Sequence, residues 1–194
     1  MEEIVSIVLA AGAGKRFGGR KQLAPLAGRP LLEHALAAAA ASSTSSTLLV
    51  LGADAAAIER GVDLEGASVV RCADWELGPG ASLGCGLAAL GPDVAAALVT
   101  LGDEPFVSPT AARRLIAARR ADLPALRATY GGRPGHPVLI ERRLFEPLIE
   151  AAPGQKPAVL LRAAGIETVE CGDLGDPADV DTPGQLEALE RARR

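Results

Sequence analysis

A glycine-rich, basic loop near the start of the chain carries the residue types that bind polyphosphates. It follows the apolar run from Ile4 to Leu9 and contains Gly12, Gly14, Gly18 and Gly19 together with Lys15, Arg16, Arg20 and Lys21. Glycines let backbone N–H groups approach an anion and adopt positive φ. The cationic side chains can neutralise phosphate oxygens. The loop therefore predicts a phosphate site at the carboxyl end of the first strand.

The loop lacks two common phosphate-binding motifs. The dinucleotide fingerprint is Gly-x-Gly-x-x-Gly, but the sixth position counted from Gly12 is Phe17. The P-loop has Lys and then Ser or Thr after its last glycine, whereas Gly19 is followed by Arg20-Lys21-Gln22. A solvated basic turn with no ligand is the plain alternative, because charge runs usually face water.

An acidic pair after a second apolar run provides a candidate metal ligand. Asp103 and Glu104 follow the buried-strand pattern from Ala95 to Leu101. A polyphosphate bound at the glycine-rich loop would need a divalent cation to neutralise its oxygens, and Mg²⁺ prefers one or two carboxylates plus substrate phosphates. We expect Asp103 to be the ligand and Glu104 to be its neighbour; the alternative makes Asp103 a turn residue. The late run Asp179-Val-Asp181-Thr-Pro183, taken alone, predicts only a helix N-terminal cap.

Two further segments could contact the rest of a substrate. Small residues around Gly80 and Ser82 would let a planar base lie against the backbone, and a capped, closely packed helix is the alternative. Trp75 is equally consistent with a core position and a pocket wall. The segment from Gly131 to Val138 contains His136, whose ring could hydrogen-bond a ligand, although the glycines and prolines of the segment alone predict a structured turn.

The elements that must position these residues alternate between strand and helix, which indicates an α/β fold with a mainly parallel sheet. The apolar runs predict strands at Ile4–Ala10, Thr47–Gly52, Ser68–Ala73, Ala95–Leu101, Ala125–Tyr130, His136–Ile140 and Glu167–Cys171. Helices are expected at Leu31–Ala41, Ala55–Gly61 with Asp54 as cap, Leu83–Leu90, Pro109–Arg120, Leu144–Ala152, Ala158–Ala163 and from Pro183 to the end. Residues 122–140 predict a hairpin or an antiparallel excursion.

Composition limits the classes of protein and partner. The 194 residues suggest one domain over 1–194. A net charge of −4 and an aromatic content of 3% argue against nucleic acid and anionic membranes as partners. No signal peptide or membrane-spanning run is evident, so a cytoplasmic location is expected. The three cysteines, Cys72, Cys85 and Cys171, lie far apart in the sequence and form no Cys-x-x-Cys pair, so they are expected to be reduced thiols.

The ordered motifs resemble those of MobA-like nucleotidyltransferases, and within that group those of molybdenum cofactor cytidylyltransferases. The matching residues are Leu9-Ala10-Ala11-Gly12-x-Gly14-x-Arg16-Phe17-Gly18-x-x-Lys21, then Leu101-Gly-Asp103-Glu-Pro105, Gly135-His136-Pro137 and Asp179-x-Asp181-Thr182-Pro183. A Ser-Leu-x-x-Gly-Leu element is matched by Ser82 to Leu87. The resemblance implies a Rossmann-like three-layer α/β/α sandwich of the nucleotide-diphospho-sugar transferase type.

The resemblance also implies roles for individual residues. Arg16 and Lys21 would steady the phosphates, Asp103 and Asp181 would hold Mg²⁺, and His136 would face the acceptor. The nucleotide would contact Leu9, Ala10, Ala11, Gly12, Gly14, Lys21, Gly80, Ser82 and Asp103.

The implied substrates are CTP and a phosphorylated pterin, molybdenum-loaded molybdopterin, with onward transfer to a molybdoenzyme or its chaperone. The alternatives are guanylyl transfer, another phosphorylated acceptor, a non-catalytic nucleotide-binding or cofactor-delivery protein, and a dinucleotide-dependent oxidoreductase. Phe17 stands where the dinucleotide fingerprint has its third glycine, and this substitution disfavours the oxidoreductase.

Overall fold

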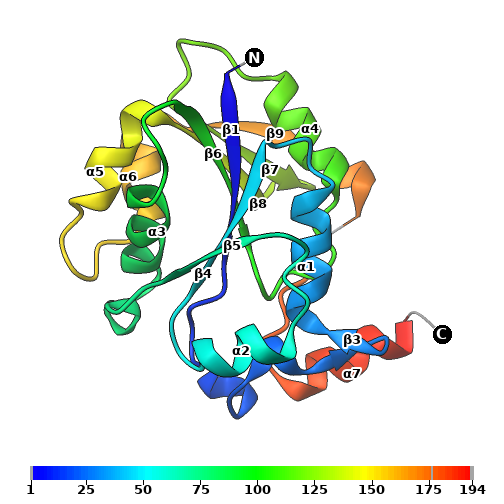
Figure 1. Ribbon diagram of the computed structural model, residues 1–194. Helices are drawn as coiled ribbons and strands as arrows, with labels where there is room; N and C mark the ends of the chain where they lie inside the picture. The colour runs from blue at the N-terminus through cyan, green and yellow to red at the C-terminus, as the bar shows by residue number, and fades with distance from the viewer. Residues whose placement is uncertain (1, 176, 193–194) are drawn as a thin grey trace.

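A seven-stranded sheet with helices on both faces forms the body of the protein in the computed structural model, which describes residues 2–175 and 177–192 (Figure 1). The strand order is β5-β4-β1-β6-β8-β7-β9. The strands are β1 Glu3–Leu9, β4 Ser46–Leu51, β5 Ser68–Arg71, β6 Val94–Leu101, β7 Ala125–Tyr130, β8 Arg133–Glu141 and β9 Glu167–Glu170. All seven predicted strands are therefore present, with ends shifted by a few residues.

The pairing pattern makes the sheet mostly parallel with one reversed strand. β1 pairs in parallel with β4 and β6, β4 with β5, and β7 with β9. β8 is antiparallel to both β6 and β7, so the predicted antiparallel excursion is confirmed. Leu9 lies opposite Val50 on one side and Leu101 on the other. The loops after β1, β4 and β6 consequently leave from one edge of the sheet, called here the carboxyl edge.

Helices cover the two faces of the sheet and complete the predicted three-layer α/β/α sandwich (Figure 1). One face is covered by α3 (Pro79–Ala88), α5 (Phe145–Ile149) and α6 (Pro157–Ala163), and the other by α1 (Leu31–Ala40) and α4 (Pro109–Ala117). Near the carboxyl edge lie α2 (Ala55–Gly61), α7 (Pro183–Ala192) and a small hairpin of β2 (Pro25–Leu26) and β3 (Arg29–Pro30).

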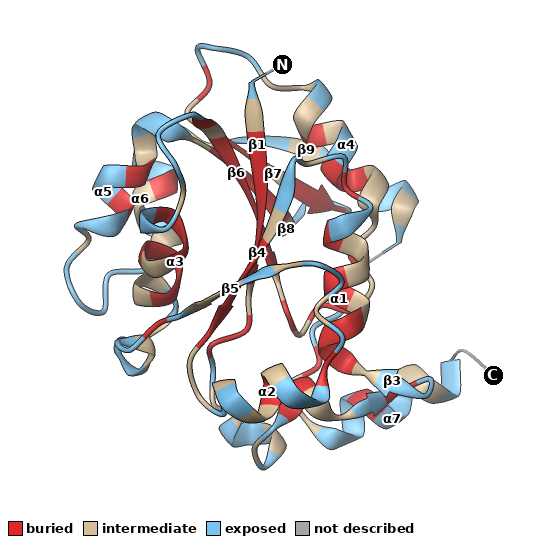
Figure 2. Cartoon of the chain, in the orientation of Figure 1, coloured by how far each residue is buried: buried red, intermediate tan, exposed pale blue. Residues whose placement is uncertain are grey.

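The core follows from alternating apolar residues on the central strands. Figure 2 shows buried residues along these strands and on the sheet-facing sides of the helices. On β1, Ile7 packs in the cluster beneath α3, and the next residue, Val8, packs in the cluster beneath α1. Both side chains have an exposed fraction of 0%. Because both faces are covered, the central strands β1 and β6 are almost continuously apolar, interrupted only by the buried Ser6 and Thr100 within these two strands, which is typical of parallel sheets.

Some helix boundaries differ from the prediction for local reasons. α3 begins at Pro79, earlier than predicted, because proline fits the first helical position, where no N–H donor is needed. Asp54 stands at the N-terminus of α2 but makes no capping bond; its carboxylate lies 3.8 Å from Arg20 Nε. α4 ends at Ala117 rather than at Arg120.

The expectation of three reduced cysteines is wrong for two of them. Cys72, which follows β5, and Cys85, on α3, form a disulfide with their Cα atoms 5.7 Å apart. The chain turns back between β5 and α3 and brings the two residues together, which their spacing in the sequence did not indicate. Cys171 is free and buried. Within the described ranges, no helix has the length and apolar character to cross a membrane.

Candidate active site at the carboxyl edge

Four predicted charged residues converge at the carboxyl edge. The Lys21 ammonium donates to Asp103 Oδ2 over 2.7 Å and to Asp181 Oδ1 over 3.2 Å. Arg16 Nη2 lies 2.8 Å from the other oxygen of Asp181. Lys21 is buried, whereas the Arg16 side chain is exposed. The two candidate phosphate ligands thus pair with the two candidate metal ligands, a charge cluster formed from three distant parts of the sequence.

Backbone contacts bring Asp181 to Asp103. The N–H of Val180 donates to the carbonyl of Asp103 over 2.9 Å, and the Val180 side chain is fully buried. The predicted cap at α7 is confirmed as a reciprocal capping box. Gln185 Oε1 accepts from the Thr182 N–H at 2.8 Å, and Thr182 Oγ1 accepts from the Gln185 N–H at 3.3 Å. The same segment therefore starts a helix and fixes a carboxylate in the cluster.

The glycine-rich loop is shaped by a left-handed residue and a buried glutamine. Gly14 has φ of 60°, and its carbonyl accepts from the N–H groups of Phe17 and Gly19. A Cβ on Gly14 would lie 3.1 Å from Lys21 Cβ, so glycine suits both the backbone and the space. Gln22 Nε2 donates to the carbonyls of Ala10 and Gly12, each over 2.9 Å. Sequence reasoning missed Gln22, because a lone glutamine beside the cations carries no pattern.

The charge cluster keeps Asp181 ionised. Burial raises the pKa of Asp181, but the Lys21 hydrogen bond and the charges of Lys21 and Arg16 oppose it, and the pKa is lowered overall. A depressed pKa keeps the carboxylate ready to bind a cation at neutral pH.

The two carboxylates fit a divalent metal. Both direct oxygens at one cationic atom, Lys21 Nζ, and carboxylate oxygens are the donors that Mg²⁺ prefers. Across residues 2–175 and 177–192, no set of three or more His, Cys, Asp and Glu side chains could hold a metal. An ion held by Asp103 and Asp181 would complete its shell with phosphate oxygens and water.

A cavity of about 590 Å³ opens beside the charge cluster. It is lined by Leu9, Ala11, Gly12, Lys15, Trp75, Glu76, Gly78, Pro79, Ser82, Leu101 and Asp103. A smaller hollow of about 80 Å³ shares part of this lining and adds Ala10, Gly14, Lys21, Gln22 and Gly102. Together they contain every predicted nucleotide-binding residue except Gly80. The sequence analysis did not single out Glu76, Gly78 and Pro79, which complete the lining.

Gly80 lies beside this cavity rather than in its lining. It lines a neighbouring hollow, and a Cβ on Gly80 would approach the carbonyl oxygen of Gln155 to 2.9 Å. Trp75, whose sequence position is consistent with both the core and a pocket wall, forms a wall of the large cavity and packs against Gly52. A Cβ on Gly52 would lie 2.4 Å from Trp75 Cγ, so this wall requires glycine.

The histidines occupy different environments. His136 Nδ1 lies 2.9 Å from Glu104 Oε1, so His136 is joined to the residue after Asp103 rather than to Asp103 itself. His34 lies on α1, with its Nε2 2.8 Å from the Leu26 carbonyl oxygen, so its ring is held by the backbone. Lys156 is exposed at the start of α6.

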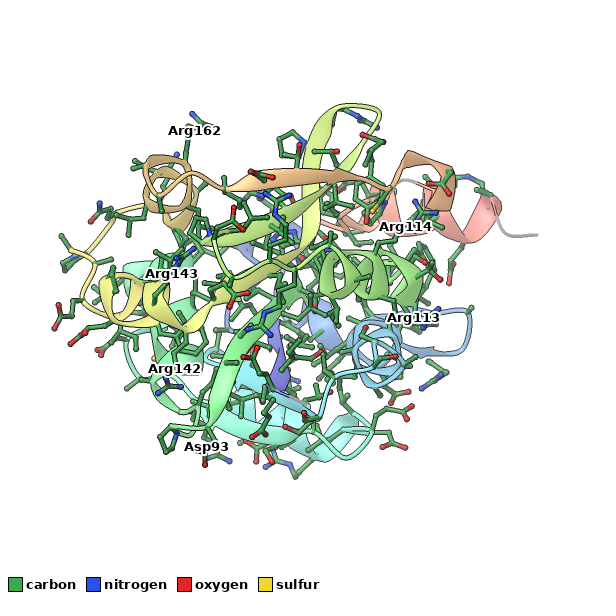
Figure 3. All side chains as sticks on the ribbon, turned by 90° about the horizontal axis from the view of Figure 1, so that it is seen from above. Asp93, Arg113, Arg114, Arg142, Arg143 and Arg162 are labelled. Atoms are coloured by element: carbon green, nitrogen blue, oxygen red, sulfur yellow. A yellow bond between two sulfur atoms is a disulfide. The ribbon has the colours of Figure 1, made fainter. Side chains whose placement is uncertain are left out.

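Other arginines, among them several that are labelled in Figure 3, are engaged in structural contacts. Arg114 forms a two-point ion pair with Asp173. Arg142 donates to the carbonyls of Gly91 and Val94. These contacts hold loops in place, and neither arginine lines the cavity or the smaller hollow beside the charge cluster.

Comparison with known proteins agrees with this arrangement. The model of a family described as the MobA-like NTP transferase domain matches residues 6–169. The chain belongs to this family. The match includes the glycine-rich loop, Asp103 and His136, whereas Asp181 lies beyond it.

This family member matches two relatives over nearly its whole length. It is 34% identical, over 96% of both chains, to the protein named nicotine blue oxidoreductase from Paenarthrobacter nicotinovorans. It superposes on Rv0371c from Mycobacterium tuberculosis H37Rv with a TM-score of 0.84, at 30% identity over 97% of this chain and 98% of that one. The complex of Rv0371c with manganese gives a TM-score of 0.81 at 30% identity, covering 98% and 99% of the two chains.

Proposed function

We propose that this protein is a Mg²⁺-dependent cytidylyltransferase that moves CMP from CTP to the terminal phosphate of molybdenum-loaded molybdopterin. The observation that carries the proposal is the charge cluster of Lys21, Arg16, Asp103 and Asp181 beside the 590 Å³ cavity. The cluster combines cations suited to phosphates with acids suited to a metal. The manganese complex of Rv0371c supports a divalent metal in this fold.

The reaction is an in-line displacement at phosphorus. An oxygen of the acceptor phosphate forms a bond to the α-phosphorus of CTP, the bond from that phosphorus to the bridging oxygen breaks, and pyrophosphate leaves. A bound metal would neutralise charge on the phosphate oxygens. Lys21 and Arg16 bind the phosphates through charge-assisted hydrogen bonds, and the glycine-rich loop orients them. The acceptor is already a nucleophile, so no covalent enzyme intermediate is needed.

Lys21 acts in two ways in this proposal. Without a metal, its ammonium neutralises the two carboxylates and keeps them close together. If these carboxylates held a cation, Lys21 would be free to pair with the phosphates, because its four-carbon stem is flexible.

The choice of CTP rests on the first loop and the base side of the cavity. Ala10-Ala11-Gly12 resembles cytidylyl rather than guanylyl members of the family, and Ser82 lines the cavity, where it can hydrogen-bond a base. The pterin acceptor, onward transfer to a molybdoenzyme or its chaperone and the cytoplasmic location complete the proposal. GTP as substrate would preserve the mechanism and change the base.

A second candidate is dinucleotide-dependent reduction, favoured by the name of the relative from Paenarthrobacter nicotinovorans. A cavity beside a glycine-rich loop would accept a dinucleotide. A hydride transfer does not use two acidic metal ligands, however, and the intact charge cluster therefore favours nucleotidyl transfer.

The test is a substrate panel with the purified protein. CTP, GTP, ATP and UTP would each be incubated with Mg²⁺, with and without molybdenum-loaded molybdopterin, and pyrophosphate would be followed. We expect acceptor-dependent release with CTP. Oxidation of NADH or NADPH without consumption of any NTP would support the second candidate and contradict the first.

A further inference from the structure

One contact at the carboxyl edge lies outside the charge cluster. Glu104 directly follows Asp103, and its Oε1 lies 2.9 Å from His136 Nδ1. In the sheet, Val99 on β6 lies opposite Val138 on the antiparallel β8. Moving two residues along each strand brings His136 beside Leu101, where β6 ends. His136 and Asp103 thus belong to the same edge.

Burial holds Glu104 in this contact, and a separate hydrogen bond holds His136. Glu104 is buried, with an exposed fraction of 8%, and its second oxygen has no hydrogen-bond partner within the described chain. The backbone of His136 is held separately, because the Tyr130 hydroxyl donates to its carbonyl over 2.7 Å. A Cβ on Gly135 would lie 2.9 Å from the Tyr130 ring, so the residue before His136 must be small.

The pairing determines which ring nitrogen is available to a ligand. An ionised carboxylate only accepts hydrogen bonds, so Nδ1 of His136 carries the hydrogen that Glu104 receives. Nε2 is then the ring nitrogen with a lone pair in the neutral imidazole. Within residues 2–175 and 177–192, no hydrogen bond or ion pair engages His136 Nε2. Orientation of a histidine by a carboxylate at its other nitrogen is a recurrent way to present Nε2 to a substrate.

We propose that Glu104 is a positioning residue for the acceptor: it fixes the tautomer and orientation of His136, so that Nε2 hydrogen-bonds the acceptor's phosphate. This inference rests on the proposed function. A phosphate monoester has a second pKa near 6, and its monoanion carries one O–H. That O–H is a donor matched to a neutral Nε2. Glu104 itself does not touch the substrate.

Kinetics of four variants test the proposal: Glu104→Ala, Glu104→Gln, His136→Ala and the double variant Glu104→Ala/His136→Ala. We expect Glu104→Ala to lower kcat/KM for the acceptor about tenfold, a size typical of residues that orient another group, and to leave KM for the NTP unchanged. Glu104→Gln should retain most activity, because its amide oxygen still accepts from Nδ1. The double variant should be no worse than His136→Ala. Glu33→Gln is the control, since Glu33 is also buried but pairs with Arg29.

The proposal would be overturned if the losses of kcat/KM in the two single variants multiplied in the double variant. It would also be overturned if Glu104→Ala raised KM for the NTP by as much as it lowered kcat/KM for the acceptor. A defect of Glu104→Gln as large as that of Glu104→Ala would also overturn it.

A second measurement is independent of turnover, because the chain has only two histidines. Imidazole ¹⁵N–¹H correlation spectra of the neutral rings should show opposite tautomers: Nδ1–H for His136 and Nε2–H for His34, whose Nε2 faces the Leu26 carbonyl. Glu104→Ala should remove the preference at His136 alone. An Nε2–H tautomer of His136 in the wild type would overturn the role of Glu104. If no NTP is consumed, the proposed function fails, and these spectra still decide the orientation of His136.

Discussion

At the scale of residues, the site is defined by the ion pairs that two cations form with two carboxylates. The sequence allowed Arg16, Lys21, Asp103 and Asp181 to be predicted individually, because each belongs to a motif. It did not predict that Lys21 would lie between the two acids, because that pairing depends on the Val180–Asp103 backbone bond across 77 residues. The Glu104–His136 contact escaped prediction for the same reason: strand register, rather than local sequence, brings the two side chains together.

Removing one member of the charge cluster should abolish most turnover. Lys21→Ala and Asp103→Asn should each reduce kcat by ~10²–10³, as expected for loss of a preorganised charge contact. Arg60→Ala is the matched control, because Arg60 is an exposed cation on α2. Steady-state kinetics would be measured beside circular dichroism. Near-normal turnover of either cluster variant in a folded protein would remove that residue from the mechanism.

At the scale of elements, periodicity and turn residues were sufficient for the strands and for most helices. The short β2–β3 hairpin was missed, since two-residue strands have no periodicity to detect. The disulfide was missed because Cys72 and Cys85 lie on different elements whose packing sets their distance. The start of α3 mattered most for the site, because it places Ser82 within the helix that lines the cavity.

Enlarging Gly52 should disturb the wall of the cavity. Gly52→Ala would place a Cβ within 2.4 Å of Trp75 Cγ and 2.7 Å of the Ala11 carbonyl. We expect the free energy of unfolding to fall by about 1–3 kcal/mol, as in overpacked cores, and the Kd for NTP to rise. Gly91→Ala is the control, since a Cβ there meets nothing within 4 Å. Denaturant unfolding and nucleotide titration would measure both effects; identical behaviour of the two variants would contradict the assigned wall.

Glu170 should make the β7–β8 turn sensitive to acid. Its carboxylate accepts from the N–H of Gly131, the Thr129 hydroxyl and the N–H of Gly172, and these bonds lower its pKa from the usual 4.5. A lowered folded-state pKa contributes stability above pH 4.5 that is lost as pH falls through the folded value. Thermal melts should therefore show a lower Tm for Glu170→Gln at pH 7, and the two Tm values should converge as the pH falls below 4.5 through the lowered pKa of Glu170. A constant difference at all pH values would contradict this role.

At the scale of the whole molecule, the site joins the two ends of the chain. The first loop follows β1, and Asp181 precedes α7, so nucleotide and metal would bridge segments that are remote in sequence. The fold class could be predicted because alternating strands and helices permit few layer arrangements. The substrate could not, because relatives with this fold include a protein named for oxidation and reduction.

Ligand binding should therefore stabilise the entire fold and depend on metal. CTP with Mg²⁺ at about 100 times Kd should add about 2.7 kcal/mol to the free energy of unfolding, which corresponds to a rise in Tm of roughly 5–10 °C for a chain of this size. Chelation of the metal should remove most of the rise, and Asp103→Asn should abolish it. A full shift in the presence of a chelator would contradict the assignment of Asp103 and Asp181 as metal ligands.

The most direct test of nucleotidyl transfer follows the α-phosphate of CTP. CTP labelled at that phosphorus would be mixed with Mg²⁺, molybdenum-loaded molybdopterin and the wild-type protein, and the products separated. We expect the label to enter a cytosine dinucleotide of the acceptor, with one pyrophosphate released for each label transferred. Label that remains in CTP, or that appears only as free CMP, would contradict it.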